Sequence, residues 1–168
     1  ALAEVKLRQR IIHTVHKPTT VFNLWGNELS MPILAAPIGG IAFNWNGYLS
    51  EADYAKAVIS GSKAAGAMGM VGDGKLEEIY QSGLDALLAE DGWGIPTIKP
   101  RPNEQISELA YQAEAAGAVA VAIDVDAAAL INMTVSGQPV GPKTFAELVE
   151  LKQNIKLPLI IKGVMEIE

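Results

Sequence analysis

The sequence contains no cysteine among its 168 residues. This excludes a disulfide framework, thiolate catalysis and zinc sites built on cysteine. Positive charge is also scarce, with 13 Lys and Arg against 19 Asp and Glu and a net charge of −6. No basic run is longer than a pair, so nucleic acid and anionic membrane surfaces are disfavoured as the main partners.

Long apolar runs are missing as well. The longest, residues 115–123, is far too short to span a membrane. The first residues, "ALAEVKLRQR", are amphipathic and charged, unlike a signal peptide. We therefore expect a cytoplasmic protein. With 49% hydrophobic residues the chain is able to build a packed core, and we expect residues 1–168 to form a single domain.

Short apolar segments alternate with segments of helical periodicity. The pattern predicts strands over residues 31–37, 67–74, 94–100, 118–126 and 157–163, with helices over residues 50–66, 75–90, 103–117 and 141–155. Ser50, Asn103 and Thr144 are the predicted N-caps, and Glu147 completes a capping box with Thr144. Gly66 and Gly117 are expected to end their helices, and Gly83 to break the second one.

Strands that are apolar on both faces indicate a parallel sheet covered by helices. An open doubly wound sheet and a TIM (β/α)8 barrel both fit this alternation. Glycine or charged residues end nearly every predicted strand: Gly39, Gly40, Gly72, Asp73, Lys99, Asp124, Asp126 and Lys162. A barrel gathers such residues in one mouth, so we favour the TIM barrel, with about the first four and a half βα units present.

Residues 1–30 precede the first predicted barrel strand. Residues 8–18 read as a helix, and residues 19–30 as a hairpin with Gly26 and Asn27 in the turn. This hairpin is expected to plug the barrel floor. On the helix, His13 and His16 would share a face, but without a third ligand we predict no metal site.

Lys162 follows the apolar run of the last strand. It could form a Schiff base, stabilise a developing anion, or only pair with Asp124 or Asp126. The two aspartates lie two apart and would share a strand face, so that one has a raised pKa and acts as acid or base. Alternatively, Asp126 lies in the following loop. The "GDG" at 72–74 lacks phosphate-loop spacing and fits a tight turn equally well.

The segments "LSMPILAAPIGG", "AAGAMGMVGDG", "AAGAVAVAIDVD" and "FAELVELKQNIKLPLIIKGVM" occur in this order. From about residue 20 onwards the chain resembles the FMN-dependent α-hydroxy-acid oxidase/dehydrogenase family. The resemblance implies a TIM barrel, an FMN cofactor and oxidation of a 2-hydroxy acid by hydride transfer to flavin. Lactate or glycolate oxidases are members of that family.

The resemblance also assigns positions. The backbone of Ala36, Pro37 and Ile38 matches the stretch that lies against the flavin ring. Gly72 stands where the family has a serine, and Asp124 where it has a threonine near the pyrimidine edge. Lys162 matches the lysine that faces flavin N1 and O2, where a fixed cation stabilises the negative charge of reduced flavin.

Departures from the family indicate a divergent member. Thr97 and Lys99 stand on the strand where the family has glutamine and tyrosine, and Ala129 stands near the position of its substrate-binding arginine. Lys99 is therefore the candidate ligand for the substrate carboxylate. Two alternatives stay open: a class I aldolase-like barrel with Lys162 as Schiff-base residue, and a catalytically incompetent half-barrel.

The resemblance places the family's catalytic histidine, its neighbouring arginine and its phosphate-binding segments after Lys162. We therefore expect the chain to be an N-terminal part of such an enzyme. A half-barrel would leave its first and last strands unpaired. We expect a homo-oligomer, or association with a chain that carries the second half.

Overall fold

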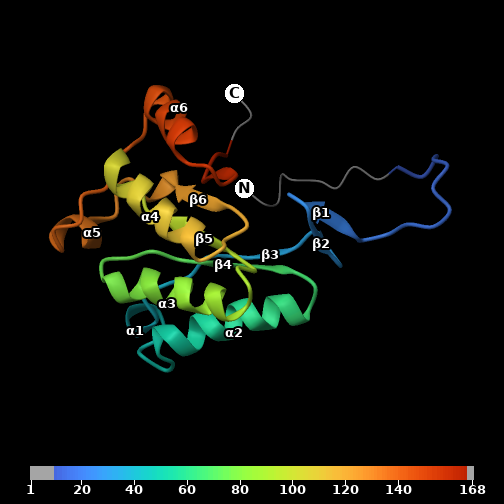
Figure 1. Cartoon of the computed structure of the whole chain (residues 1–168), viewed down its shortest axis with the longest axis horizontal. Helices are drawn as coiled ribbons and strands as arrows, with labels where there is room; N and C mark the ends of the chain where they lie inside the picture. Colours follow the sequence, from blue (N-terminus) through green and yellow to red (C-terminus); the bar gives the residue numbers. More distant parts are fainter. Residues whose placement is uncertain (1–9, 166–168) are drawn as a thin grey trace.

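The computed structural model describes residues 10–165. Its centre is a five-stranded parallel sheet of strand order β3-β4-β5-β6-β7 (Figure 1). The strands are β3 (Leu34–Ala35), β4 (Met68–Val71), β5 (Ile95–Ile98), β6 (Val121–Asp124) and β7 (Leu159–Lys162). Each strand pairs with the next one in the sequence, without the reversal of order that defines a doubly wound sheet. The prediction of a partial TIM barrel is confirmed.

A long helix follows each of the first four strands. These helices are α2 (Glu51–Ala64), α3 (Glu77–Ala89), α4 (Asn103–Ala115) and α6 (Phe145–Asn154). Three short elements that the sequence pattern did not predict lie in the connections: α1 (Ile41–Asn44), α5 (Ile131–Val135) and a 3-10 turn, Val125–Ala127. They follow the carboxyl ends of β3 and β6. No helix within residues 10–165 is long and apolar enough to cross a membrane.

The two faces of the sheet bury different side chains because residues alternate along each strand. The outer face packs on the helices through residues such as Val71, Ile98 and Ile123, which contact the same core as Leu87 and Leu151. The inner face forms a second, smaller cluster, made of Met68, Met70, Ile95, Ala120 and Ala122. Inner-face residues further along the strands therefore point toward the barrel mouth.

The N-terminal hairpin completes the inner cluster. Its strands are β1 (Phe22–Leu24) and β2 (Asn27–Leu29), paired antiparallel. The turn is Trp25–Gly26, both with positive φ, and not Gly26–Asn27 as predicted. Leu29 is fully buried against Met68 and its neighbours, at the amino ends of the strands, where a floor for the barrel was expected.

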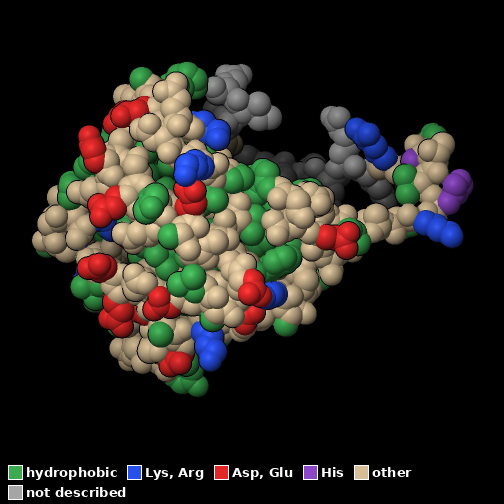
Figure 2. All heavy atoms as spheres, in the orientation of Figure 1, with side chains coloured by type: hydrophobic (Ala, Val, Ile, Leu, Met, Phe, Trp, Pro, Cys, Tyr) green, Lys and Arg blue, Asp and Glu red, His purple; other side chains and the backbone are tan. Residues whose placement is uncertain are grey.

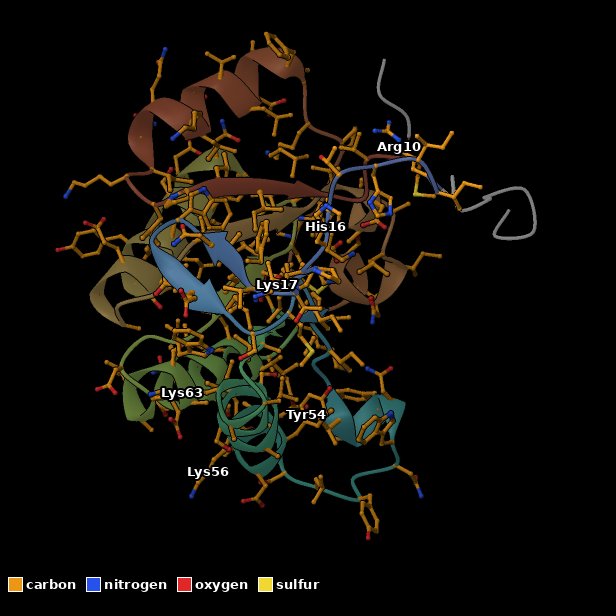
Figure 3. The ribbon with its side chains drawn as sticks, turned by 90° about the vertical axis from the view of Figure 1, so that its right-hand side faces the viewer. Arg10, His16, Lys17, Tyr54, Lys56 and Lys63 are labelled. Carbon is orange, nitrogen blue, oxygen red and sulfur yellow. The ribbon has the colours of Figure 1, made fainter. Side chains whose placement is uncertain are left out.

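The predicted helix over residues 8–18 is wrong where the structure describes it. Residues 10–18 form no helix, and residues 1–9 lie outside the described part. Figure 3 labels Arg10, His16 and Lys17 on this segment, which projects from the body of the molecule in Figure 1. Both histidines lie on it in Figure 2, so the shared helix face proposed for them does not form. A short segment whose sequence has helical periodicity does not form a stable helix when no other part of the protein packs against its apolar face.

Two of the three predicted N-caps are confirmed. Ser50 Oγ accepts a hydrogen bond from Asp53 N at 3.0 Å, and Thr144 forms the full capping box with Glu147. The Asn103 prediction is wrong, because Pro102 caps α4 and the Asn103 amide donates to the Glu147 carbonyl instead. The break predicted at Gly83 is also wrong.

Gly83 lies within the uninterrupted helix α3. An added Cβ there would come within 2.7 Å of Val71 Cγ2. The glycine therefore lets the helix approach β4 closely.

Candidate active site

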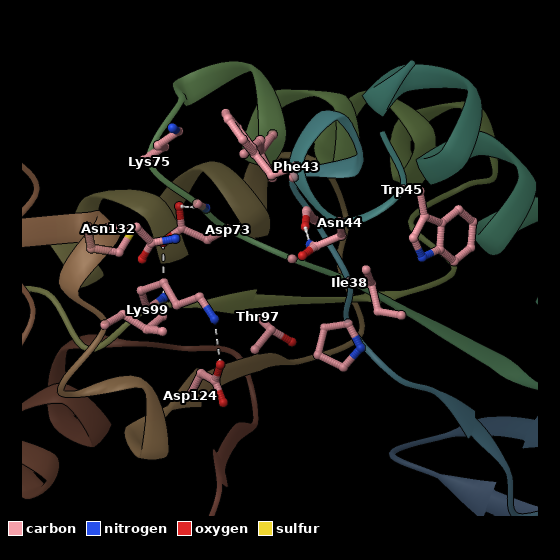
Figure 4. A pocket seen from close by; sticks show the side chains of 18 residues that line it. Ile38, Phe43, Asn44, Trp45, Asp73, Lys75, Thr97, Lys99, Asp124 and Asn132 are labelled. Carbon is pink, nitrogen blue, oxygen red and sulfur yellow. Dashed lines mark hydrogen bonds and ion pairs between the residues drawn. The ribbon is translucent and has the colours of Figure 1, made fainter. Parts of the chain in front are cut away.

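A cleft of about 490 Å³ lies at the carboxyl ends of β3 to β6 (Figure 4). Its walls come from the loops that follow these strands and from α1 and α5. Lining residues from the sheet side include Pro37, Ile38, Gly72, Thr97, Lys99 and Asp124. This end of the sheet is where α/β barrels place their active sites, because every strand delivers a loop to it.

A chain of charges crosses the inner face at the cleft. Asp124, which is 7% exposed, accepts hydrogen bonds from Lys99 Nζ at 2.7 Å and from Lys162 Nζ at 2.5 Å. The three residues end neighbouring strands or follow them directly, and Asp124 is in register with Lys162. Parallel pairing of β5, β6 and β7 is thus what brings the two lysines to one carboxylate.

The charge states of this group follow from its contacts. Burial raises the pKa of Asp124, but hydrogen bonds with Asp126, Lys162 and Lys99 outweigh burial and lower the pKa to about 2. The hydrogen bond to Asp124 raises the pKa of Lys162 above its ordinary value. At neutral pH the pair is therefore fully ionised. The predicted raised pKa is wrong for Asp124, because the two cations dominate its surroundings.

Asp126 does not share a strand face with Asp124. The strand ends at Asp124, and Asp126 lies in the 3-10 turn that follows, with its side chain 54% exposed. Its carboxylate still lies 3.6 Å from Lys162 Nζ. Of the two interpretations of this residue, the loop position is the correct one.

A buried ion pair of Asp73 and Arg101 supports one wall of the cleft. Arg101 Nε and Nη2 donate to the two carboxylate oxygens of Asp73 at 2.9 and 2.8 Å. Nη2 also donates to the Gly74 carbonyl, and Nη1 to Gln138 Oε1. The loop "GDG" is therefore a turn fixed by its own aspartate. Arg101 could not be predicted as a site residue, because nothing in its sequence spacing links it to Asp73.

The predicted cofactor-binding residues are distributed as follows. Pro37, Ile38, Gly72 and Asp124 line the cleft, as does Lys99, whereas Ala36 and Lys162 do not. Lys162 is connected to the cleft only through Asp124.

At Gly72 a Cβ atom would lie 3.0 Å from Gly39 N and 3.2 Å from the Ile38 carbonyl carbon. The chain after β3 thus lies so close to Gly72 that any side chain there, including the family's serine, requires a backbone shift.

Thr97 is a further feature of the cleft wall. Its hydroxyl oxygen is the one buried side-chain oxygen or nitrogen that has no hydrogen-bond partner within residues 10–165. Thr97 is 2% exposed and lines the cleft from the inner face of β5. An unpartnered buried hydroxyl is costly, so this site is suited to a ligand with a polar edge.

A family profile and several solved structures relate the chain to known proteins. The profile of a family described as FMN-dependent dehydrogenase matches residues 1–139. No protein of curated function is significantly similar in sequence.

Solved structures share the fold. A mandelate oxidase variant with (S)-mandelic acid is 20% identical with a TM-score of 0.61, and the match covers 98% of this chain and 51% of that one. A flavocytochrome b2 variant with sulfite bound is 22% identical with a TM-score of 0.64, covering 94% of this chain and 42% of that one. The flavin-binding domain of baker's yeast flavocytochrome b2 gives 20% identity and a TM-score of 0.64, with coverages of 94% and 42%. The chain spans about half the length of these proteins.

Proposed function

The chain belongs to the FMN-dependent dehydrogenase family, and we therefore propose that it forms part of an oxidoreductase that transfers a hydride from a 2-hydroxy acid to FMN. The prediction of FMN as the cofactor agrees with this family and with the flavin-binding domain among the similar structures. The substrate class is inferred from the resemblance and from the similarity to a mandelate oxidase.

One observation carries this proposal. The cleft, the ammonium group of Lys162 and the carboxylate of Asp124 all lie at the same end of the sheet. A lysine pointing to the opposite end from Asp124 would have removed the basis for a flavin-facing cation. Instead the two side chains meet at 2.5 Å.

The residues of the cleft fit a flavin ring. Thr97 offers a buried hydroxyl without a partner among the described residues, and Pro37, Ile38 and Gly72 line the cleft with it. These residues, with Asp124 and Lys162, would hold the ring. FMN, when bound, supplies the two-electron acceptor for the hydride.

Lys162 is the residue proposed to act on the cofactor. Its raised pKa favours the protonated form, and its hydrogen bond to Asp124 holds this positive charge next to a residue that lines the cleft. Such a charge stabilises negative charge that develops on a neighbouring group. Asp124 positions this ammonium, and Lys99 shares the same carboxylate.

The alternative, a class I aldolase-like enzyme, requires a neutral lysine amine as nucleophile. The hydrogen bond from Lys162 to Asp124 favours the charged form and disfavours this chemistry. Borohydride treatment with a carbonyl substrate checks it: we expect no covalent adduct on Lys162 by mass spectrometry.

Titration of the purified chain with FMN tests the proposal. We expect quenching of flavin fluorescence on binding. Bleaching of the flavin absorption by lactate, glycolate or mandelate without oxygen is expected when a second half of the barrel, which would carry the family's catalytic histidine, is supplied as well. The Lys162→Met variant should bind FMN but bleach more slowly. Failure to bind FMN would leave the incompetent half-barrel as the better description of this chain.

We also propose that the chain associates with another half-barrel, as a homo-oligomer or with a chain that carries the second half. Both β3 and β7 are edge strands of the described sheet, and unpaired edges favour such pairing. Gel filtration checks this, since a compact monomer of 17.8 kDa would contradict it.

A further inference from the structure

We propose that Lys75 binds the carboxylate of the acid substrate, and that Phe43 beside it selects acids with an apolar substituent. This inference rests on the proposed function of the cleft. Both residues line the cleft, and Lys75 Nζ lies 3.7 Å from the centroid of the Phe43 ring (Figure 4). Neither residue was singled out from the sequence.

The charges around the cleft leave Lys75 as the available cation. Lys99, the ligand expected from the sequence, is paired with Asp124 at 2.7 Å. Arg101, behind the wall, is held by Asp73 at 2.8 Å. Within residues 10–165 no carboxylate lies within 4.0 Å of Lys75 Nζ. Of the two lysines that line the cleft, Lys75 is therefore the one without a carboxylate partner among the described residues.

The backbone before Lys75 is fixed although its side chain is free. Arg101 donates to the Gly74 carbonyl at 2.9 Å, and Asp73 accepts from Gly74 N at 2.7 Å. The position from which the lysine extends is thus set by the buried ion pair. Because this backbone is already ordered, only the side chain of Lys75 loses conformational freedom when it binds a ligand.

Phe43 gives the cation a second contact and gives the cleft an apolar side. An ammonium over an aromatic face is held by the ring quadrupole, while its remaining N–H groups stay free to donate. Ile38, Trp45 and Met133 line the same cleft. A carboxylate on Lys75 would therefore carry its substituent against apolar surface. The substrate class that fits is a 2-hydroxy acid with an aromatic or branched aliphatic side chain.

Binding of mandelate and of its uncharged amide, mandelamide, tests the inference by calorimetry on the full chain with FMN added. For Lys75→Gln we expect about a tenfold loss of mandelate affinity with mandelamide affinity unchanged, because one charge-assisted hydrogen bond is removed. Lys75→Arg should retain most of the preference for the acid. Lys56→Gln is the matched control, since Lys56 extends outward from α2 (Figure 3) and is not among the residues that line the cleft.

Two results would overturn the inference: wild-type protein that binds mandelate no better than mandelamide, or Lys75→Gln that keeps the wild-type preference. Glycolate provides the test of Phe43, because an acid without an apolar substituent should bind more weakly than mandelate and should lose less affinity than mandelate in Phe43→Ala. FMN affinity is measured for every variant by flavin fluorescence. A chain that binds mandelate through Lys75 but binds no FMN would refute the proposed function and leave this inference standing.

Discussion

Replacing Asp124 with asparagine is expected to destabilise the protein by about 2 kcal/mol at pH 7. The lowered pKa, from 3.8 to about 2, corresponds to this amount, since each pKa unit is about 1.4 kcal/mol. The variant also leaves Lys99 and Lys162 facing each other without a shared counter-charge. Repulsion between the two ammonium groups acts in the same direction.

The pH dependence gives this prediction its specific form. A carboxyl whose folded pKa is depressed contributes stability above its unfolded pKa and loses it as pH falls through the folded value. The contribution of Asp124 should therefore be complete above about pH 5, fall to about half at pH 3 and vanish below about pH 2, given its folded pKa of about 2. Urea unfolding of wild type and Asp124→Asn at pH 7, 4 and 3 measures the difference.

Asp91→Asn is the matched control, because Asp91 also pairs with a lysine but its side chain is 97% exposed. Exposed pairs contribute less than about 1 kcal/mol, so this variant should differ little from wild type. Equal midpoints for Asp124→Asn and wild type at pH 7 would refute the reasoning. So would a loss of stability at pH 3 as large as at pH 7, since it would have a source other than ionisation of Asp124.

Two further variants test other parts of the fold by the same unfolding assay. Arg101→Met should cost about 3–5 kcal/mol, because it leaves the Asp73 carboxylate buried without its cation. If Asp73→Asn in the Arg101→Met background restores no stability, the lost charge pair is not the cause. Leu29→Ala should lower the free energy of unfolding by about 2–5 kcal/mol, because it leaves a cavity in the inner cluster. Phe22→Ala, at a 43% exposed position of the same hairpin, should cost far less, and equal losses would argue against a floor role.

Much of the half-barrel could be predicted from local sequence. Short apolar runs, bounded by proline or ending at glycine or charged residues, located all five strands of the sheet, because a strand buried on both faces is apolar along its length. Helix starts were predictable where a side chain caps the backbone, as at Ser50 and Thr144. Asparagine is also a favoured N-cap residue, but the side-chain amide of Asn103 donates hydrogen bonds to Glu147 and Glu150 of another helix instead. Tertiary contacts override local preference there.

The site was only partly predictable. The strand ends pointed to Lys99, Asp124 and Lys162, since carboxyl ends of parallel strands meet at one edge. The sequence could not show that Asp124 binds both lysines. That contact depends on how β5, β6 and β7 are aligned with one another and on which residues of each strand face inward. It also gave no signal for Lys75 and Phe43, which come from separate loops that meet only in the folded chain.

The position of β7 at the sheet margin has a consequence for assembly. Its last residue, Lys162, has 36% of its side chain exposed, and β7 has β6 as its one neighbour in the described sheet. A strand that docks along this margin must dehydrate the ammonium, at a cost that its bond to Asp124 already offsets in part. If a second half-barrel docks there, as proposed, its binding is coupled to the surroundings of Lys162, the proposed flavin-facing charge.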